Sequence, residues 1–209
     1  MLPFLLLLLF AAPQGAGNSP AKAAAVDDGP SYTASGEMVR PENYREWVFL
    51  TSGVDMSYSD SAAAPARSVF DNVFVNPSAY RAFLKSGTWP DKTVLVLEIR
   101  GAEGAASINK RGHTQSPEVR GIEVHVKDSS KEGGWTFYGF GATGAGKPFP
   151  RTASCYTCHQ EHGIVDTTFV QFYPTLLPLA KDRGTIRPDL LKELEPVAAP
   201  AAGSPASSK

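Results

Sequence analysis

The sequence predicts an α+β fold in which a mostly antiparallel, five-stranded sheet carries a few helices. Five short runs rich in β-branched and aromatic residues occur between about residues 47 and 140. Most of these runs are joined by short turns, which connect antiparallel neighbours. Helical patterns occur in a few segments only, whereas a wound parallel sheet needs a helix between every pair of strands.

The predicted strands follow one another with different patterns of side chains. In the fourth strand, apolar and polar residues alternate from Ile122 to Lys127, which is typical of a strand with one face on the core and the other in water. His125 lies on the polar face, so we expect it to face solvent. The five expected strands are 47–50, 69–75, 93–99, 122–127 and 135–140.

Helices are predicted in three segments. Residues 77–84 open with Pro77, which is favourable in the first turn of a helix, and place an apolar stripe along one side. Residues 151–162 and 168–181 are also expected to be helical. The second of these should bend at Pro174, because proline interrupts the backbone hydrogen bonds of a helix.

The two ends of the chain differ in composition from its middle. Residues 1–25 are predicted to be a signal peptide, because an apolar run is followed by small residues suited to cleavage, although no Lys or Arg precedes that run. We expect a flexible segment over 26–38, one domain over 39–183 and a largely disordered tail over 184–209. The protein is therefore expected to be periplasmic or otherwise exported.

Charge and hydropathy exclude two classes of partner. The chain has 20 basic and 21 acidic side chains, so it has no strong positive field to attract nucleic acid. Its longest apolar run is far shorter than the roughly 20 residues that span a bilayer. We expect no nucleic-acid partner, and no membrane span after the signal peptide is removed.

The two cysteines of the chain, Cys155 and Cys158, are followed directly by His159. This Cys-x-x-Cys-His pattern is the attachment motif of c-type haem. The two thiols add across the vinyl groups of the porphyrin, and the histidine becomes the proximal ligand of the iron. The sequence therefore predicts one covalently attached haem c, with Cys155 and Cys158 as its attachment points and His159 as the metal ligand.

The same cysteines could serve two other kinds of site. With His162, the motif offers four nominal zinc ligands, but all of them lie within one short segment, which strains a tetrahedral site. A redox-active dithiol is usually found near the start of a βαβ unit, and this pair comes late in an antiparallel pattern. Covalent haem remains the leading interpretation.

The second axial position of the iron decides what such a haem does. Electron-transfer cytochromes commonly supply a methionine from beyond the motif, but here the only methionines are Met1, Met38 and Met56. His113 lies in a polar loop and His162 is too close to His159 to reach the other side. The sequence therefore predicts a five-coordinate iron with an open distal site.

Several further segments accompany the haem motif in a fixed order, and together they span about residues 39–181. In this arrangement the chain resembles the cytochrome P460 family, which also includes the beta type of cytochrome c prime. The segments that carry the resemblance are Pro41–Val48, Val73–Pro77, Trp89–Val94, Val126–Asp128, Gly134–Tyr138, Cys155–His159 and Phe169–Pro174.

The resemblance implies a mostly antiparallel sheet with one c-type haem, usually in a homodimer. In the P460 members proper, a lysine on the third strand forms an extra bond to the porphyrin, and those proteins oxidise hydroxylamine. The position that matches this lysine is Leu97, which has no nucleophilic atom. The resemblance is therefore closest to the beta cytochromes c prime, which bind diatomic gases, and it leaves open whether the chain is an enzyme.

These observations predict a haem protein that binds nitric oxide or carbon monoxide. Phe70, Phe74 and Leu97 are the candidate residues of an apolar distal wall, although they also suit an ordinary hydrophobic core. An apolar wall disfavours dioxygen, which benefits from a hydrogen-bond donor when bound. The alternatives are an oxidoreductase acting on hydroxylamine or a related nitrogen compound, which needs another lysine such as Lys110, and an electron-transfer cytochrome with a redox partner protein, which needs Met38 or Met56 on the iron.

Overall fold

The computed structural model describes residues 27–58, 67–141 and 144–195. The predicted signal peptide and the final part of the predicted tail, residues 196–209, lie outside these ranges. None of the helices in the described part of the chain has the length and the apolar content that a bilayer crossing requires.

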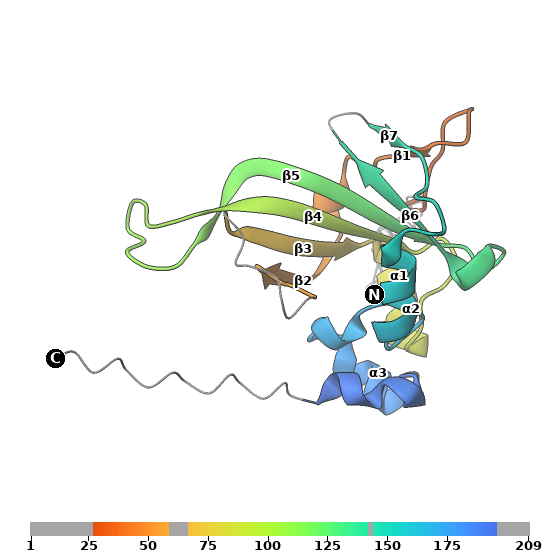
Figure 1. The fold of residues 1–209 in the computed structure, drawn as a ribbon. Coiled ribbons are helices and arrows are strands. Elements are labelled where there is room, and N and C mark those ends of the chain that lie inside the picture. The colour runs from red at the N-terminus through yellow and green to blue at the C-terminus, as the bar shows by residue number, and fades with distance from the viewer. Residues whose placement is uncertain (1–26, 59–66, 142–143, 196–209) are drawn as a thin grey trace, which may run out of the picture.

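A five-stranded antiparallel sheet forms the centre of the molecule (Figure 1). Each strand pairs with the next one along the chain, so the order of the strands follows the sequence and the α+β prediction is confirmed. Two strands extend well past their predicted ends and form a long hairpin. The strands are β2 (Val48–Val54), β3 (Val69–Val75), β4 (Val94–Glu103), β5 (Thr114–Lys127) and β6 (Trp135–Phe140).

The pairing of β4 with β5 contains two irregularities. The register shifts between Ile99 and Arg100 and again between Arg100 and Ala102. Before Ile99, the residues of β4 alternate regularly between the two faces of the sheet. Bulges of this kind add residues to one strand only and therefore separate the regular part of the hairpin from its outer end.

The main helices lie on one side of the sheet, near one end of the strands (Figure 1). We call the sheet face toward them the helical face. The predicted helix over 168–181 is two elements separated around Pro174, because proline has no backbone N–H to continue the hydrogen-bond ladder. The helices of this side are α1 (Pro77–Ser86), α2 (Ser154–His162), η3 (Val170–Phe172) and α3 (Leu177–Arg183), and a short turn η2 (Glu132–Gly134) precedes β6.

The opposite face of the sheet is covered by the N-terminal part of the domain, and we call it the terminal face. There β1 (Met38–Val39) pairs with β7 (Ala145–Gly146), and η1 (Tyr44–Glu46) follows. Met38 is fully buried against the sheet core. The prediction of a flexible segment up to residue 38 is therefore wrong at its C-terminal end, since an apolar side chain there completes the core.

The predicted disordered tail also begins too early. Residues Pro188–Leu194 form the short helix η4, and Leu190 is buried in the core on the helical side of the sheet. The backbone N–H of Arg187 donates a hydrogen bond to the carbonyl of Ile164 (2.9 Å), which ties this segment to the chain after α2. The domain therefore includes residues 184–195.

Candidate functional site

A cavity of about 500 Å³ lies between the helical face of the sheet and α2. Cys155, Cys158 and His159 line it from α2, and Phe169 and Tyr173 line it from the following segment. The sheet contributes the opposite wall, with side chains from four strands. The structure thus brings the three residues of the haem motif to one largely apolar cavity.

The residues of the helical face, most of which line the cavity, are arranged in rows across the strands. Residues directly opposite in paired strands share a face, and successive residues on one face are about 7 Å apart along a strand. The pairings define three rows. The first row is Val75, Leu95, His125 and Phe137; the second is Thr51, Val73, Leu97 and Glu123; the third is Gly53, Asp71, Ile99 and Gly121.

His159 lies at the first row. Its ring centre is 4.8 Å from those of His125 and Phe137, and 4.2 Å from that of Phe169. These contacts hold the imidazole on several sides. The second and third rows therefore line the part of the cavity that extends away from His159 along the strands.

The tautomer of His159 is set by one hydrogen bond. Its Nδ1 lies 2.8 Å from the backbone carbonyl oxygen of Thr167. A carbonyl oxygen only accepts, so Nδ1 carries the hydrogen and Nε2 keeps a free lone pair. Burial lowers the pKa of His159 despite this hydrogen bond, which favours the neutral ring that binds metals.

The turn after α2 places that carbonyl group. A Cβ atom at Gly163 would lie 2.3 Å from the carbonyl carbon of Thr167, so only glycine allows the turn to approach the helix end. Asp166 and Thr167 both have positive φ angles, of 49° and 56°. Such a conformation is unfavourable for residues with side chains and persists only where the surroundings hold it.

Asp166 is the residue through which the protein holds this turn. Its Oδ2 accepts a hydrogen bond from the backbone N–H of Trp89 (2.8 Å) and pairs with Nζ of Lys127 (2.9 Å). Its carbonyl oxygen accepts a hydrogen bond from Nε1 of Trp135 (2.8 Å). Sequence reasoning missed these supporting residues, because no local pattern links them to the haem motif.

The cysteine pair fits covalent haem better than zinc. Both thiols are free and partly buried in the cavity, and burial raises the pKa of each one. Their spacing of three residues places them on one side of α2. Across the described ranges, no group of three or more His, Cys, Asp or Glu side chains is arranged to hold a metal ion. His162 instead pairs with Glu193 (3.1 Å) and is half exposed.

The prediction that His125 faces solvent is wrong. The alternation along β5 is as predicted, but its polar face looks into the cavity, because α2 and the segment after it cover that face. Burial and the neighbouring His159 hold the pKa of His125 well below its usual range, so its ring is uncharged. A sequence pattern shows which side chains share a face, and it does not show what covers that face.

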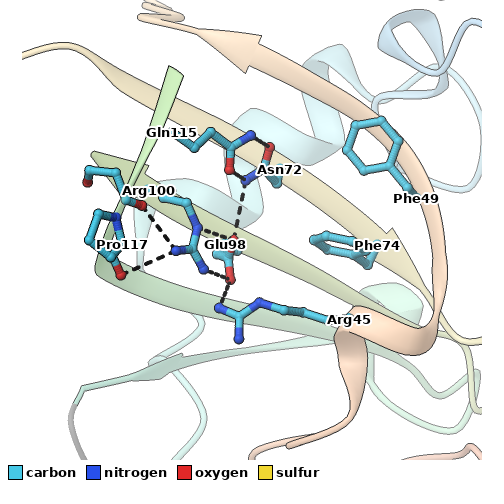
Figure 2. Close-up of a pocket in the computed structure, with 9 residues that line it drawn as sticks. Arg45, Phe49, Asn72, Phe74, Glu98, Arg100, Gln115 and Pro117 are labelled. Atoms are coloured by element: carbon cyan, nitrogen blue, oxygen red, sulfur yellow. Dashed lines mark hydrogen bonds and ion pairs between the residues drawn. The ribbon is translucent and has the colours of Figure 1, made fainter. Parts of the chain in front are cut away.

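Leu97 does line the cavity, whereas Phe70 and Phe74 do not. Val73 is directly opposite Leu97, so its sequence neighbour Phe74 points to the other face of the sheet. Phe74 is drawn on that face in Figure 2. Its ring packs edge-on against that of Tyr44, with ring centres 5.5 Å apart. Phe70 pairs with Arg100 and is on the same terminal face.

Two carboxyl groups that the sequence analysis did not single out face the cavity instead. Burial raises the pKa of Asp71, and the nearby Asp55 adds to this effect. Burial likewise raises the pKa of Glu123, with a further contribution from Asp71. The signal for Glu123 was its position two residues before His125, on the same face of the strand.

The other candidates are divided between the two faces. Met38 is buried on the terminal face and cannot reach the cavity, whereas Met56 lines it. Lys110 is exposed in the loop between β4 and β5, where its Nζ donates a hydrogen bond to the carbonyl of Ser107 (2.9 Å). No lysine or arginine is among the described residues that line the cavity.

A different arrangement of charges lies on the terminal face (Figure 2). Glu98 is 2% exposed, and its carboxylate accepts hydrogen bonds from Nε and Nη2 of Arg100 (2.8 and 2.9 Å). It also accepts hydrogen bonds from the hydroxyl of Tyr44 and the guanidinium of Arg45. Burial alone would raise the pKa of Glu98, but these bonds outweigh burial and lower it to about 2.

Comparison with known proteins agrees with the geometry. No curated protein is significantly similar to the chain. The sequence model of the Cytochrome P460 family matches residues 41–170, which include the five strands of the sheet and the whole haem motif. This match covers more than half of the chain. The family implies haem c, and its cytochromes are typically exported. The chain belongs to the cytochrome P460 family of haem proteins.

Proposed function

We propose that this protein carries one haem c, bonded to the thiols of Cys155 and Cys158, and uses it to bind a small diatomic gas such as nitric oxide or carbon monoxide. His159 would hold the iron through its free Nε2. When bound, the haem would supply an iron that coordinates the gas. The observation that carries the proposal is that the cavity holds the attachment residues together with Leu97, and that no lysine is among its described lining residues.

The three rows of the sheet have different roles in this proposal. The first row and Phe169 hold the His159 ring, and the carbonyl of Thr167 fixes its tautomer. Val73, Leu97 and Ile99, in the second and third rows, form the apolar part of the remaining wall. Nitric oxide and carbon monoxide need little help from hydrogen-bond donors, so an apolar wall suits them.

A specific observation favours a second candidate function. The carboxyl groups of Asp71 and Glu123 face the same cavity, and burial raises the pKa of each one. Carboxyl groups with raised pKa values are candidates for the general acid–base catalysis that a redox reaction of hydroxylamine or a related nitrogen compound requires. We rank this function second because Leu97 cannot form the cross-link that the resemblance associates with hydroxylamine oxidation.

Met56 keeps electron transfer as a third alternative. Its thioether sulfur packs over the third-row residue Gly53, on the cavity side of the sheet. A methionine sulfur on the iron would close the gas-binding position.

Spectra of the purified protein test the proposal against both alternatives. We expect an intact mass equal to one polypeptide plus one haem, a high-spin ferrous spectrum, and carbon monoxide binding without loss of a protein ligand. The double variant Cys155→Ala with Cys158→Ala should release its haem to acid-acetone. A low-spin ferrous spectrum that disappears in Met56→Ala would establish electron transfer. Sustained hydroxylamine turnover with a haem–lysine bond would establish the oxidase.

The proposal extends to location and assembly. An exported protein meets the periplasmic machinery that attaches haem c, and the resemblance implies a homodimer. Sedimentation of the haem-loaded protein, together with its recovery from the periplasmic fraction, tests these two points.

A further inference from the structure

His125 is a partly buried side chain that lines the cavity, and its ring nitrogens have no part in the proposed function. It lies in the first row, between Leu95 and Phe137. Its ring is stacked on that of Phe137, with centres 4.0 Å apart, and meets the edge of His159 at 4.8 Å. Aromatic contacts thus hold the imidazole of His125 in place, directly beside His159 of the haem motif.

The hydrogen-bonding capacity of His125 is not used by the protein. Within the described ranges, neither of its ring nitrogens has a hydrogen-bond partner, and the side chain lines the cavity. A neutral imidazole has one N–H donor and one acceptor nitrogen. A ring N–H that faces a cavity without a protein partner is available to an acceptor on a bound molecule or on water.

His125 is not placed to be a second ligand of the same iron. Two imidazoles on opposite sides of one metal, each with a metal–nitrogen bond of about 2 Å, need ring centres farther apart than the observed separation. The ring centres of His125 and His159 are 4.8 Å apart. His125 therefore lies beside the axial ligand.

We propose that His125 is a further haem-binding residue, whose ring N–H donates a hydrogen bond to a carboxylate of the haem. This inference rests on the proposed function. The two propionate carboxylates are the strongest hydrogen-bond acceptors on a haem, whose remaining rim is apolar. No lysine or arginine is among the described lining residues, so any donor to these carboxylates from the described wall is uncharged. The other first-row side chains, Val75, Leu95 and Phe137, offer no donor.

The test compares two substitutions in the haem-loaded protein. His125→Phe keeps a ring against Phe137 but removes the N–H, whereas His125→Gln keeps an N–H donor. We expect the propionate-bending band in the resonance Raman spectrum to shift to lower frequency in His125→Phe, and to return toward the wild-type position in His125→Gln. The control His113→Phe alters an exposed loop histidine and should leave the band unchanged.

A second measurement does not depend on the spectrum. In the background without the two attachment cysteines, His125→Phe should release haem to apomyoglobin roughly tenfold faster than the same protein with His125, the effect of one hydrogen bond to a charged group. If His125→Phe does not fold, His125→Leu replaces it in both measurements.

The outcomes separate this inference from the proposed function. A wild-type protein without covalent haem would overturn the proposed function itself. A wild-type protein with covalent haem, whose propionate band and haem release are the same with and without the His125 N–H, would overturn only the role of His125.

Discussion

Carboxyl groups on the two faces of the central sheet have opposite surroundings. On the terminal face, two arginines and a tyrosine surround Glu98 and lower its pKa to about 2. On the helical face, Asp71 and Glu123 have raised pKa values, and no Lys or Arg is among the described cavity residues. Glu98 therefore stabilises the fold as a paired charge, whereas Asp71 and Glu123 remain available to a bound ligand.

The cause of the difference is the origin of the covering segments. Tyr44 and Arg45 belong to η1, which crosses the terminal face and supplies two of the donors to Glu98. The helical face is covered by α2 and the segment after it, which supply thiols, aromatic rings and His159. Both faces belong to the same sheet, and they differ chemically because different segments cover them.

The largest effect is expected from breaking the terminal-face cluster. Glu98→Gln keeps the shape of the side chain but leaves two guanidinium groups without their anion, which should lower the free energy of unfolding by about 3–5 kcal/mol. Urea unfolding of the haem-loaded protein measures this change. The matched control Glu118→Gln breaks only the partly exposed pair with Arg120 and should cost less than about 1 kcal/mol. Equal effects of the two substitutions would contradict the comparison.

A pair of truncations tests the assignment of the faces. Phe74→Ala should lower the free energy of unfolding by about 3 kcal/mol, near the low end for a phenylalanine because the ring is partly exposed. It should leave carbon monoxide rebinding after flash photolysis unchanged. Leu97→Ala should cost about 2 kcal/mol, because the side chain already borders a cavity, and should speed rebinding. Altered rebinding in Phe74→Ala would place that residue at the ligand.

The pH dependence of stability should differ between the faces. The pKa of Glu98 is lower in the folded state than its ordinary value of 4.5, so its contribution is complete above that value and is lost as the pH falls toward about 2. Glu98→Gln should flatten this acid limb in urea unfolding between pH 5 and pH 2. For Asp71 and Glu123 the sign reverses: their contribution is present at low pH and is lost as the pH rises through their raised pKa values. An unchanged acid limb in Glu98→Gln would contradict this assignment.

The smallest effect on stability is expected from Glu123→Gln. The substitution removes a carboxyl group whose surroundings disfavour its charged form. The free energy of unfolding at pH 7 should therefore change by less than about 1 kcal/mol, in the stabilising direction. The pH profile of carbon monoxide binding should nevertheless lose an inflection, because Glu123 faces the cavity. A large loss of stability would show that Glu123 is structural, as Glu98 is.

The strands, the haem motif and the family were predictable from the sequence because each rests on a local pattern. The alternation from Ile122 to Lys127 and the spacing of the cysteines need no knowledge of distant residues. The error at Phe74 has a different origin: choosing its face requires the register between β3 and β4, which only the pairing of Val73 with Leu97 reveals. Hydrophobicity alone favours either face.

The supporting contacts of His159 could not be predicted for the same reason. Trp89, Lys127 and Trp135 come from three separate parts of the chain and converge on Asp166. Similarly, Leu190 is one apolar residue in a polar C-terminal segment, and its burial depends on a space between other elements. Contacts between such distant residues produce no repeating pattern in the sequence.

The regular alternation of β4 restricts how this protein can change in length. Leu97 and Glu98 are neighbours in sequence but belong to opposite faces, so inserting or deleting one residue just before them would move the carboxylate into the cavity and the leucine among the arginines. A change of two residues would keep the faces but displace the side chains by about 7 Å along the cavity. Beyond the register shifts at Arg100 this restriction ends, because the strand no longer borders the cavity. Insertions and deletions in descendants of this sequence should therefore occur mainly in the outer part of the β4–β5 hairpin.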